Sequence, residues 1–376
     1  MNNPEILIHD LSRGGAGVGT LPSGKRVFVP QTAPGDRVRV RVTTDEKRFA
    51  EAETEEVLER SSTRTEPRCA VFGRCGGCEW QHLPYGTQWE TKKSGVQHAL
   101  KRVQLGSAET IPWEEFPAES AYGYRNRVQV RTLKGQLGFY ARRSHTIVDI
   151  ASCPIARPEI NETIEKLRLS PEIQADKEHK LELALMPSGQ VEVFRDRPHA
   201  AAGFRQINDE QNKRLQDWIG ENYPDGYAVL DLFGGDGNLS RGLWARAPKT
   251  EIIDRWGTLS ADAPSTVQLT KKTALEWAML TKRAESSEDG TPVFAIIDPP
   301  RQGLWVEGVP DFVKQLTDAL RTTGVTKMVL VGCEPDAWAR DLSRLESLGA
   351  HVEKAAVFDF FPQTHHVESA AVLYFH

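Results

Sequence analysis

Five cysteines carry the most reactive side chains of this 376-residue chain, and their spacing divides them into four and one. Three lie together as Cys69-x5-Cys75-x2-Cys78, with two glycines between the last pair that let the backbone fold closely around a metal centre. A tetrahedral metal or cluster site needs a fourth thiolate, and Cys153 is the nearest candidate. Zinc sites usually pair one CxxC with a second CxxC or an HxxxH, so a lone fourth cysteine favours an iron–sulfur cluster. An odd cysteine count argues against a framework of disulfides.

The fifth cysteine, Cys333, ends the apolar run MVLVGC and lies far from the other four in the sequence. Catalytic side chains of α/β enzymes gather at the ends of buried strands, and a thiolate is a strong nucleophile. A lone cysteine that ends a strand is more often a core residue, so position alone leaves both interpretations open. Glu368 is similarly ambiguous, because a lone glutamate near a C-terminus is usually solvated.

A glycine-rich turn follows another apolar run, in the stretch VLDLFGGDGNLS. Asp231 ends the expected strand, and the glycines after it let a ligand approach the backbone. No lysine of the Walker A type follows, which argues against a nucleoside triphosphate. Asp254 lies 23 residues after Asp231, at the end of the expected strand TEIID, where a carboxylate can bind the ribose of a nucleotide.

The stretch IIDPPRQGL narrows the choice of cofactor. An Asp-Pro-Pro sequence after the fourth strand of an α/β fold is typical of S-adenosylmethionine enzymes that act on bases. An aromatic residue after the prolines would indicate methylation of an amino group, and Arg301 stands there instead. The turn and this stretch together favour S-adenosylmethionine over a dinucleotide.

Three segments are expected to position these residues, and they predict an α/β protein with two smaller β-rich parts. Residues 1–61 alternate with period two and contain Gly/Pro turns, which predicts a small OB-like barrel of a kind that often binds RNA. Residues 62–202 hold the four cysteines, a helical linker over about 83–114, and antiparallel strands. Residues 203–376 alternate strands and helices, which predicts a Rossmann-like domain.

A basic stretch without acidic residues runs from Ser120 to Val148. Six basic side chains are interleaved with four aromatic ones, a pattern in which cations pair with phosphates and rings stack on bases. The alternative is a half-exposed strand pair with solvated charges. The candidate RNA contacts are Arg125, Arg127, Arg131 and Arg142.

Composition limits the classes of protein further. Apolar residues make up 39% and charged residues 26%, as in ordinary globular proteins, and the net charge of −5 excludes a uniformly basic surface. No apolar run approaches the roughly 18 residues of a membrane span, and no basic-then-apolar leader stands at the start. We therefore expect a cytoplasmic monomer with no membrane contact.

The motifs resemble those of the RumA-type uracil-5 RNA methyltransferases along nearly the whole chain. The stretch GGAGVGTLPSGKRVFVPQTAPGDRVRVRV resembles their TRAM barrel, and CAVFGRCGGCEWQH with Cys153 resembles their four-cysteine motif, which implies a [4Fe-4S] cluster. The stretches FRQIN, VLDLFGGDGN, IIDPPRQGL, GCEPDAWARDL and FPQTHHVES follow in the family's order.

The resemblance implies roles for single residues. Cys333 would add to C6 of uracil, and Glu368 would remove the C5 proton after methylation. His365 and His366 are adjacent and point in different directions, so we expect them to shape the site around Glu368 rather than to share a metal. The cofactor contacts implied are Gln206, Asp231, Phe233, Gly235, Gly237, Asp254 and Asp298.

The chain departs from the family pattern at three places. Glu334 follows Cys333 where the family usually has Asn, which predicts a raised thiol pKa. Asp254 replaces the usual Glu, and the segment after it is short. We favour 23S ribosomal RNA as the substrate, with the T-loop of transfer RNA as the alternative. A non-catalytic iron–sulfur protein that binds RNA is the alternative of another class.

Overall fold

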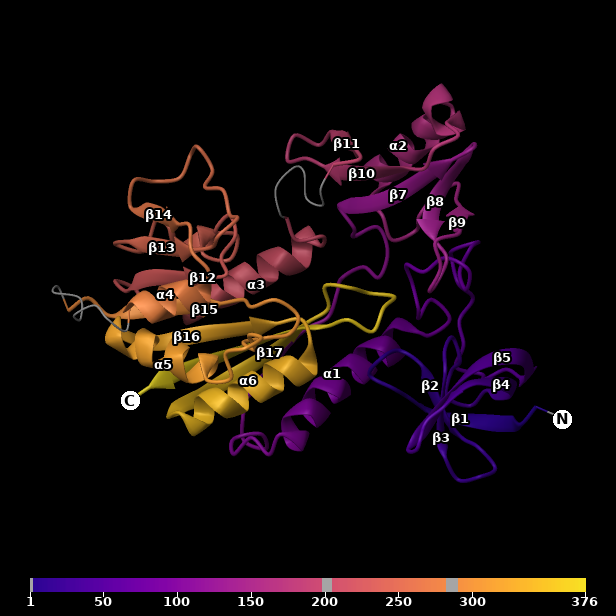
Figure 1. Cartoon of the computed structure of the whole chain (residues 1–376), viewed down its shortest axis with the longest axis horizontal. Coiled ribbons are helices and arrows are strands. Elements are labelled where there is room, and N and C mark those ends of the chain that lie inside the picture. Colours follow the sequence, from indigo (N-terminus) through magenta and orange to yellow (C-terminus); the bar gives the residue numbers. More distant parts are fainter. Residues whose placement is uncertain (1–2, 198–204, 282–289) are drawn as a thin grey trace. The chain divides into compact units, whose positions relative to one another are not determined.

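The structure is a computed structural model that describes residues 3–197, 205–281 and 290–376 (Figure 1). It contains two compact units, each built from separate stretches of the chain. The first unit comprises Met1–Lys92, Glu119–Ala201 and Phe361–His365, and the second comprises Lys93–Ala118, Ala202–Phe360 and His366–His376. None of the described helices is long and apolar enough to cross a membrane.

The first unit begins with a closed five-stranded barrel, in the order β1-β2-β3-β5-β4. In β4 the side chains of Val38 and Val40 are fully buried while Arg37 and Arg41 are exposed, as the period-two pattern predicts. The expected N-terminal barrel is therefore confirmed. Its strands are β1 (Glu5–Leu11), β2 (Gly17–Thr20), β3 (Arg26–Val29), β4 (Arg37–Asp45) and β5 (Phe49–Glu59).

The same unit holds a five-stranded antiparallel sheet, in the order β11-β10-β7-β8-β9. Val130, Leu137 and Leu183 of this sheet pack with Ile160 and Ile164 of α2 into a fully buried core, and Cys153 packs against it. The elements are β7 (Arg127–Leu133), β8 (Gln136–Tyr140), β9 (Ile147–Asp149), α2 (Pro158–Arg168), η1 (Pro171–Gln174), β10 (His179–Leu185) and β11 (Val191–Arg195).

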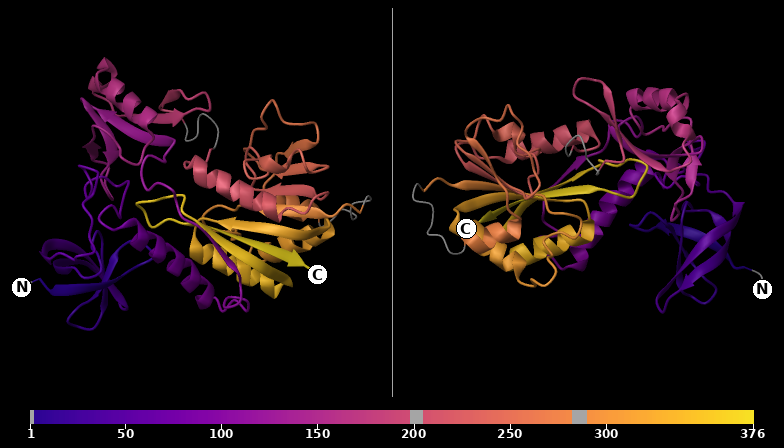
Figure 2. Two further views of the ribbon diagram at one scale, coloured as in Figure 1. Left: turned by 180° about the vertical axis from the view of Figure 1, so that it is seen from behind. Right: turned by 45° about the horizontal axis from the view of Figure 1, so that its top comes forward.

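The second unit is built on an eight-stranded sheet, in the order β14-β13-β12-β15-β16-β18-β17-β6. Figure 2 shows the ribbon from two further sides. The strands from β14 to β16 are parallel, and β18 is antiparallel to both of its neighbours. The strands are β6 (Trp113–Phe116), β12 (Ala228–Leu232), β13 (Thr250–Ile253), β14 (Val267–Thr270), β15 (Val293–Ile297), β16 (Val325–Gly332), β17 (Ala350–Phe358) and β18 (Glu368–Phe375).

Helices cover this sheet and give the α/β architecture that the sequence predicts. α5 and α6 pack against β16, and Trp218 of α3 meets the ring of Phe358 in β17 edge to face. The boundary between the two units falls within α1. The helices are α1 (Tyr85–Arg102), α3 (Asp209–Asn222), α4 (Ala274–Thr281), α5 (Phe312–Thr322) and α6 (Pro335–Ser347).

Two local expectations differ from the structure. After the glycine-rich turn, where the alternation of strands and helices predicts a helix, the chain forms only the 3-10 turn η2 (Arg241–Leu243). Residues 93–118, expected with the cysteine segment, belong to the second unit. There β6 pairs in parallel with β17, and Phe116 stacks on Phe358 with ring centroids 4.5 Å apart.

Candidate active site and cysteine pocket

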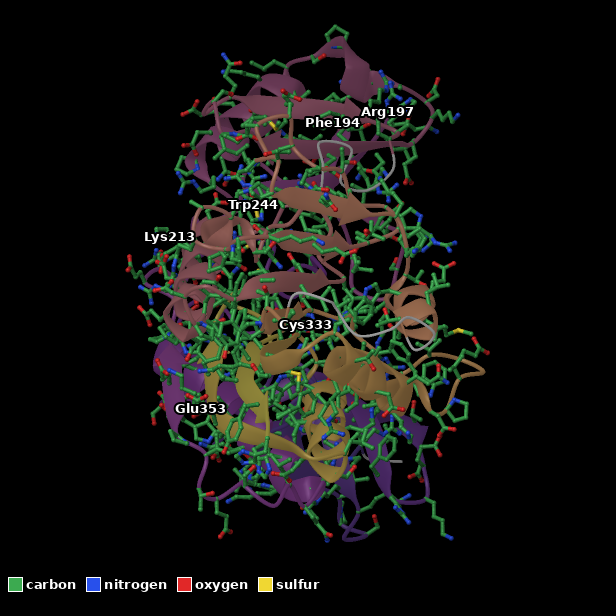
Figure 3. All side chains as sticks on the ribbon, turned by 90° about the vertical axis from the view of Figure 1, so that its left-hand side faces the viewer. Phe194, Arg197, Lys213, Trp244, Cys333 and Glu353 are labelled. Atoms are coloured by element: carbon green, nitrogen blue, oxygen red, sulfur yellow. The ribbon has the colours of Figure 1, made fainter. Side chains whose placement is uncertain are left out.

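Three carboxylates and one thiol lie in a row along one edge of the second unit's sheet. Parallel strands end at the same edge, and β13, β12, β15 and β16 are neighbours in that order. These side chains come from the carboxyl ends of the four strands, as Asp254, Asp231, Asp298 and Cys333. Cys333 is labelled in Figure 3.

Glu368 joins this row from an antiparallel strand. It is the first residue of β18, which pairs with β16 in a register that sets Gly332 opposite Ser369. Cys333 follows Gly332 in the sequence, and Glu368 precedes Ser369. The backbones of Cys333 and Glu368 therefore face each other one residue beyond the pair of Gly332 and Ser369. Residues 35 positions apart in sequence are thus brought to the same end of the sheet.

The glycine-rich turn after β12 has a backbone that only certain residues tolerate. A side chain on Gly234 would come within 2.8 Å of Asp231 and Ile252, whereas nothing lies within 4 Å of the position that a Cβ on Gly235 would take. Gly237 and Phe233 have positive φ, of 76° and 61°. A positive φ strains a non-glycine residue, and such strain is concentrated at ligand-binding turns.

The carboxyl group of Asp231 faces this turn with one oxygen unsatisfied. Its Oδ2 accepts a hydrogen bond of 2.6 Å from the Ser240 hydroxyl, while Oδ1 is buried and has no hydrogen-bond partner. Burial raises the pKa of Asp231 to about 7, with further contributions from the charges of Asp298 and Asp254. An orphaned carboxylate oxygen beside an open glycine turn fits a ligand with hydrogen-bond donors, and S-adenosylmethionine carries both an ammonium and ribose hydroxyls.

Asp254 is already engaged by the backbone. Its Oδ1 accepts the N–H groups of Trp256 (2.7 Å) and Gly257 (2.8 Å), and its Oδ2 accepts that of Gly235 at 3.2 Å. A carboxylate oxygen has two lone pairs, so one acceptor position is left, on Oδ2. A side chain on Gly257 would overlap the carbonyl of Gly235. Glycine at position 257 therefore lets the short segment after Asp254 pack closely against the glycine-rich turn.

The thiol of Cys333 is half-buried and strongly disfavoured as a thiolate. Burial raises its pKa to about 12, the negative charges of Glu368 and Asp298 add to this, and Arg301 lowers it. Glu334, which the sequence suggested as the cause, is not among these main causes. It is the N-cap residue of α6, and its side chain makes no capping hydrogen bond.

The two carboxylates beside this thiol are also hard to ionise. Glu368 is 5% exposed, and burial together with the charge of Asp298 raises its pKa well above the usual value. Burial raises the pKa of Asp298 to about 7. Perturbed pKa values of several neighbouring groups are typical of catalytic sites.

Arg301 is a further candidate for a functional residue, which the sequence analysis did not single out as part of the site. Its Nη2 lies 2.9 Å from Nδ1 of His366, and its charge lowers the pKa of both Cys333 and Glu368. The sequence signal was available: a cation stands directly after the Asp-Pro-Pro stretch that ends in the site. His365 and His366 do take different partners, since His365 hydrogen-bonds to Glu79.

The loop that carries Arg301 is held by α6. Asp341 is fully buried and accepts the N–H of Leu304 at 2.6 Å, while Arg340 donates to the carbonyl of Gln302 at 2.6 Å. The loop, α6 and the end of β16 line a pocket of about 200 Å³ that includes Cys333. The remaining expected cofactor contact, Gln206, is half-buried and lies three residues before α3.

The four other cysteines come together in the first unit. They line one pocket of about 530 Å³, whose other walls are mainly apolar, and they are Cys69, Cys75, Cys78 and Cys153. Burial raises the pKa of the Cys78 thiol to about 12, and the three other thiols add to that effect. Among the described residues, no three His, Cys, Asp or Glu side chains are grouped closely enough to hold a single metal ion.

The basic stretch is less available to RNA than its sequence suggests. Arg127 is only 6% exposed and forms an ion pair of 3.5 Å with Glu182, which argues against its expected contact with RNA. Arg131 lies 4.8 Å over the ring of Tyr140 and forms a 3.5 Å ion pair with Glu178. Both acids lie outside the stretch, on β10 or next to it, and the sequence pattern gave no sign of that pairing.

The two other arginines of the prediction lie in different surroundings. Arg125 lines the cysteine pocket, and its Nε is buried without a hydrogen-bond partner. Arg142 is partly exposed in the loop after β8. Of the four arginines, Arg142 therefore stays the best placed for RNA.

The fold and the row of side chains define a class of protein, an S-adenosylmethionine-dependent methyltransferase with an N-terminal barrel. Residues 4–54 match the TRAM domain, and residues 290–375 match the family described as tRNA (Uracil-5-)-methyltransferase. The 23S rRNA (uracil(1939)-C(5))-methyltransferase RlmD of Chromohalobacter salexigens is 31% identical, over 98% of this chain and 88% of its own. An uncharacterized RNA methyltransferase of Bdellovibrio bacteriovorus is also 31% identical, over 98% of this chain and 94% of its own.

A solved structure has the same fold along nearly the whole chain. The Pyrococcus abyssi tRNA (uracil-54, C5)-methyltransferase, solved with S-adenosyl-L-homocysteine, matches with a TM-score of 0.69 and 23% identity. The match covers 98% of this chain and 99% of that one. The protein therefore belongs to the RNA uracil-5 methyltransferase family, and it is an S-adenosylmethionine-dependent enzyme that acts on RNA.

Proposed function

We propose that this enzyme forms 5-methyluridine in 23S ribosomal RNA through a covalent bond between Cys333 and C6 of the target uracil. The observation that carries the proposal is the placement of a thiol and a buried carboxylate at one sheet edge, one register step beyond Gly332 and Ser369. C5 of uracil is a weak nucleophile, so a thiolate at C6 is needed to activate it and a base at C5 to restore the ring.

The Cys333 thiolate bonds to C6, and the electrons of the C5–C6 double bond move toward C5 and O4. C5 would then take the methyl group of bound S-adenosylmethionine, so that the C5–methyl bond forms as the sulfur–methyl bond breaks and S-adenosylhomocysteine leaves. Glu368 then takes the C5 proton, the double bond re-forms, and the C6–S bond breaks to return the thiolate. One proton is produced in the cycle and passes from Glu368 to solvent.

Arg301 makes this sequence of ionisations possible. The thiol and the carboxylate must both be charged for their steps, yet burial raises the pKa of each. The guanidinium of Arg301 lowers both pKa values, since an opposite charge stabilises the ionised form. We assign Arg301 as the cation that supports the charged forms of Cys333 and Glu368.

The cofactor is assigned to the open side of the glycine-rich turn. Asp231 would accept hydrogen bonds with its free Oδ1, and Asp254 would use its one remaining acceptor position for a ribose hydroxyl. The proposed contacts of the cofactor are Gln206, Asp231, Phe233, Gly235, Gly237, Asp254 and Asp298.

A [4Fe-4S] cluster is proposed for the pocket lined by Cys69, Cys75, Cys78 and Cys153. A single zinc would need four sulfurs only about 3.8 Å apart, whereas a four-iron cluster binds each thiolate at its own iron and takes a wider spacing. The apolar walls and four thiols of one pocket support the cluster. Four thiolates occupy all four irons, so we assign the cluster a structural role.

Ribosomal RNA is proposed as the substrate because the RlmD relatives act on it by name and extend along almost the whole chain. Transfer RNA is the second candidate, because the structure with the same fold is a tRNA (uracil-54, C5)-methyltransferase. The TRAM barrel and Arg142 are proposed to contact RNA in either case.

The test uses RNA that contains 5-fluorouridine, as a 23S fragment and as a transfer RNA in separate reactions with S-adenosylmethionine. Fluorine at C5 cannot leave as a proton, so the cycle stops at a covalent protein–RNA adduct that survives a denaturing gel. We expect the adduct with the 23S fragment, and its absence in Cys333→Ala. An adduct with transfer RNA alone would transfer the proposal to that substrate, and an adduct that persists in Cys333→Ala would refute the nucleophile.

A further inference from the structure

The pocket that the four cysteines line in the first unit contains a single charged side chain among its described lining residues, that of Arg125. The other walls are mainly apolar, and no carboxylate lies among them. Four thiolates outweigh the positive charge of a [4Fe-4S] core, so the bound cluster keeps a net negative charge. Negative charge in apolar surroundings is costly unless a cation compensates it. Arg125 is the residue of the lining that can do so.

The guanidinium of Arg125 has a donor to spare in this pocket. Its Nε is buried and has no hydrogen-bond partner, although buried donors in native proteins nearly always have one. Arg127, by contrast, has the carboxylate of Glu182 within 3.5 Å of its Nε. A buried charged donor beside four thiols fits an acceptor that carries negative charge, and sulfur of a cluster is such an acceptor.

The backbone holds Arg125 next to one of the cysteines. The N–H of Arg125 donates to the carbonyl of Ile155 (2.9 Å), and its carbonyl accepts the N–H of Arg157 (3.0 Å). Cys153 is fixed as well, because Asn161 accepts its N–H (2.7 Å) and donates to its carbonyl (3.1 Å). Burial raises the pKa of the Cys153 thiol, and the charge of Arg125 opposes this effect. The guanidinium is therefore close enough to stabilise negative charge on sulfur.

Neutral donors reach other sulfurs of the pocket. The N–H of Gly77 donates to Sγ of Cys75 at 3.4 Å. The side chain of Gln81 hydrogen-bonds to the Cys78 thiol, which opposes the rise in pKa that burial causes. Hydrogen bonds to sulfur and nearby charges are the means by which a protein sets the reduction potential of a cluster. Arg125 adds a full positive charge to these neutral donors.

We propose that Arg125 belongs to the iron–sulfur site and not to the RNA-binding surface, and that its charge retains the cluster and raises its reduction potential. This inference rests on the proposed [4Fe-4S] cluster. Reduction adds one negative charge to the cluster, so a nearby cation stabilises the reduced form more than the oxidised form. The basic stretch then has two uses, since Arg125 serves the cluster while Arg142 remains the arginine proposed for RNA.

The experiment is a reductive titration of the anaerobically purified holoenzyme with dithionite, followed by the paramagnetic resonance signal of the reduced cluster. In Arg125→Met, we expect the equilibrium constant for reduction to fall by about 10- to 100-fold, because an opposite charge at close range changes ionisation equilibria by that order. This corresponds to a potential lower by roughly 60–120 mV, at about 59 mV for each tenfold change. Iron should also be lost to a chelator faster than from the wild type. Arg125→Lys keeps the charge and should restore most of the potential.

The control is Arg131→Met, because Arg131 carries the same charge on the same stretch but pairs with Glu178 and does not line the pocket. It should leave the potential unchanged. RNA binding at fixed salt should change by less than about threefold in Arg125→Met, since no phosphate contact is removed.

An unchanged potential in Arg125→Met would refute the inference, as would an equal fall in Arg131→Met. Equal falls in Arg125→Met and Arg125→Lys would refute the role of the charge. If Arg125→Met takes up no cluster, retention of the cluster in Arg125→Lys supports the inference and its loss there refutes it. Weaker RNA binding at an unchanged potential would return Arg125 to the RNA surface. A wild-type protein that holds no iron would instead refute the proposed cluster and leave the methyltransferase activity untouched.

Discussion

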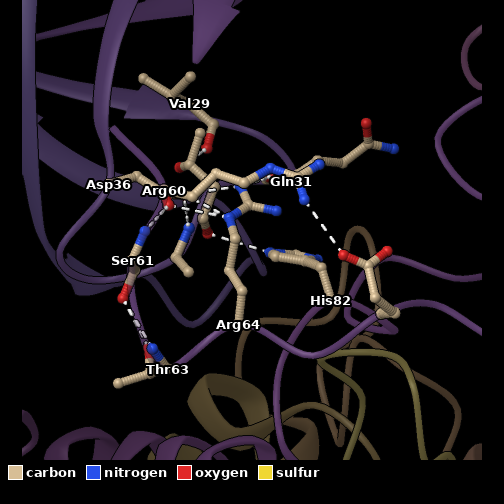
Figure 4. A network of polar contacts seen from close by, with 11 residues as sticks. Val29, Gln31, Asp36, Arg60, Ser61, Thr63, Arg64 and His82 are labelled. Atoms are coloured by element: carbon tan, nitrogen blue, oxygen red, sulfur yellow. Dashed lines mark hydrogen bonds and ion pairs between the residues drawn. The ribbon is translucent and has the colours of Figure 1, made fainter. Parts of the chain in front are cut away.

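Buried carboxylates occur in both units, and their partners differ. In the first unit Asp36 is fully buried and accepts the N–H groups of Ala33 (2.6 Å) and Ser61 (2.9 Å) together with the guanidinium of Arg64 (2.7 Å, Figure 4). Burial alone would raise its pKa, yet Arg64 and these backbone donors bring the pKa below the usual value. In the second unit, Ser240 donates to one oxygen of Asp231 and the charge of Arg301 acts on Glu368. Burial outweighs these contributions, so the pKa values of both carboxyl groups are raised.

The difference separates a carboxylate that stabilises the fold from those that are available to substrates. Asp36 connects the end of the barrel to the chain that enters the cysteine segment, because Ser61 and Arg64 lie on that chain. One oxygen of Asp231 has no hydrogen-bond partner, and the pKa of Glu368 is raised by burial. Burying carboxyl groups in this way lowers the stability of the folded state, so they do not serve to stabilise the fold. Carboxylates of this second kind are typical of binding and catalytic sites.

The largest expected effect is on turnover, in Glu368→Gln. Loss of a general base costs about 10²- to 10⁴-fold, and we expect the loss of turnover in this range. The free energy of unfolding at pH 8 should not fall, since burial disfavours the charged form of Glu368 and the amide cannot ionise. Turnover is measured by tritium release from C5-labelled uridine in RNA. A variant that keeps wild-type turnover would contradict the assignment.

The second expected effect is on stability, in Arg64→Met. Removing one partner of a buried ion pair leaves the other charge uncompensated and costs about 3–5 kcal/mol. Asp36 is fully buried and would lose the guanidinium that lowers its pKa. Urea denaturation measures the loss, and Arg60→Met, which removes an exposed arginine nearby, is the control with a change of less than about 0.5 kcal/mol. If the two substitutions lowered the free energy of unfolding equally, the ion pair of Arg64 with Asp36 would contribute no more to stability than an exposed arginine.

A third effect is expected from pH, through His82. Burial is the main cause that lowers its pKa to about 4, from about 6.5 in the unfolded chain. As pH falls below 6.5, His82 becomes protonated in the unfolded state but stays neutral in the folded state. The free energy of unfolding therefore decreases down to about pH 4. Between pH 7 and pH 5 the loss should be about 2 kcal/mol, and it should vanish in His82→Gln. An identical pH dependence in both proteins would show that another group is responsible.

The smallest expected effect has the opposite sign, in Asp231→Asn. The folded pKa of Asp231, about 7, lies above the unfolded value, so its contribution to stability is present at acidic pH and is lost as pH rises through 7. The amide removes this penalty, which is about 4 kcal/mol at pH 8 for a shift from 3.8 to about 7. It also buries an NH2 group where a carboxylate oxygen has no partner, at a cost of about 1–3 kcal/mol, so we expect the free energy of unfolding at pH 8 to rise by on the order of 1 kcal/mol. Calorimetry should show S-adenosylmethionine binding weakened at least about tenfold. A less stable variant that binds normally would place Asp231 with Asp36 as a structural residue.

Part of the fold could be predicted from local patterns in the sequence. The alternation around Val38 and Val40 indicated the barrel strands, because side chains of a strand point alternately to its two faces. The apolar runs that end in Asp231, Asp298 and Cys333 indicated strands whose carboxyl ends meet at one edge. The four-cysteine spacing indicated one site, and the structure places those thiols in one pocket.

The rest depended on which elements become neighbours, and only the tertiary structure decided that. The pairing of Arg127 with Glu182 requires β7 to lie beside β10. The addition of Trp113–Phe116 to the sheet as β6 requires that β17 has a free side on which to pair. The positive φ of Gln363 is enforced by Gln88, 275 residues earlier. The sequence thus determined residue types, strand periods and turn chemistry, which are local properties of the chain. Which charges are neutralised and which carboxylates stay unpaired was set by packing between distant segments, because Coulomb and hydrogen-bond energies depend on distance in space.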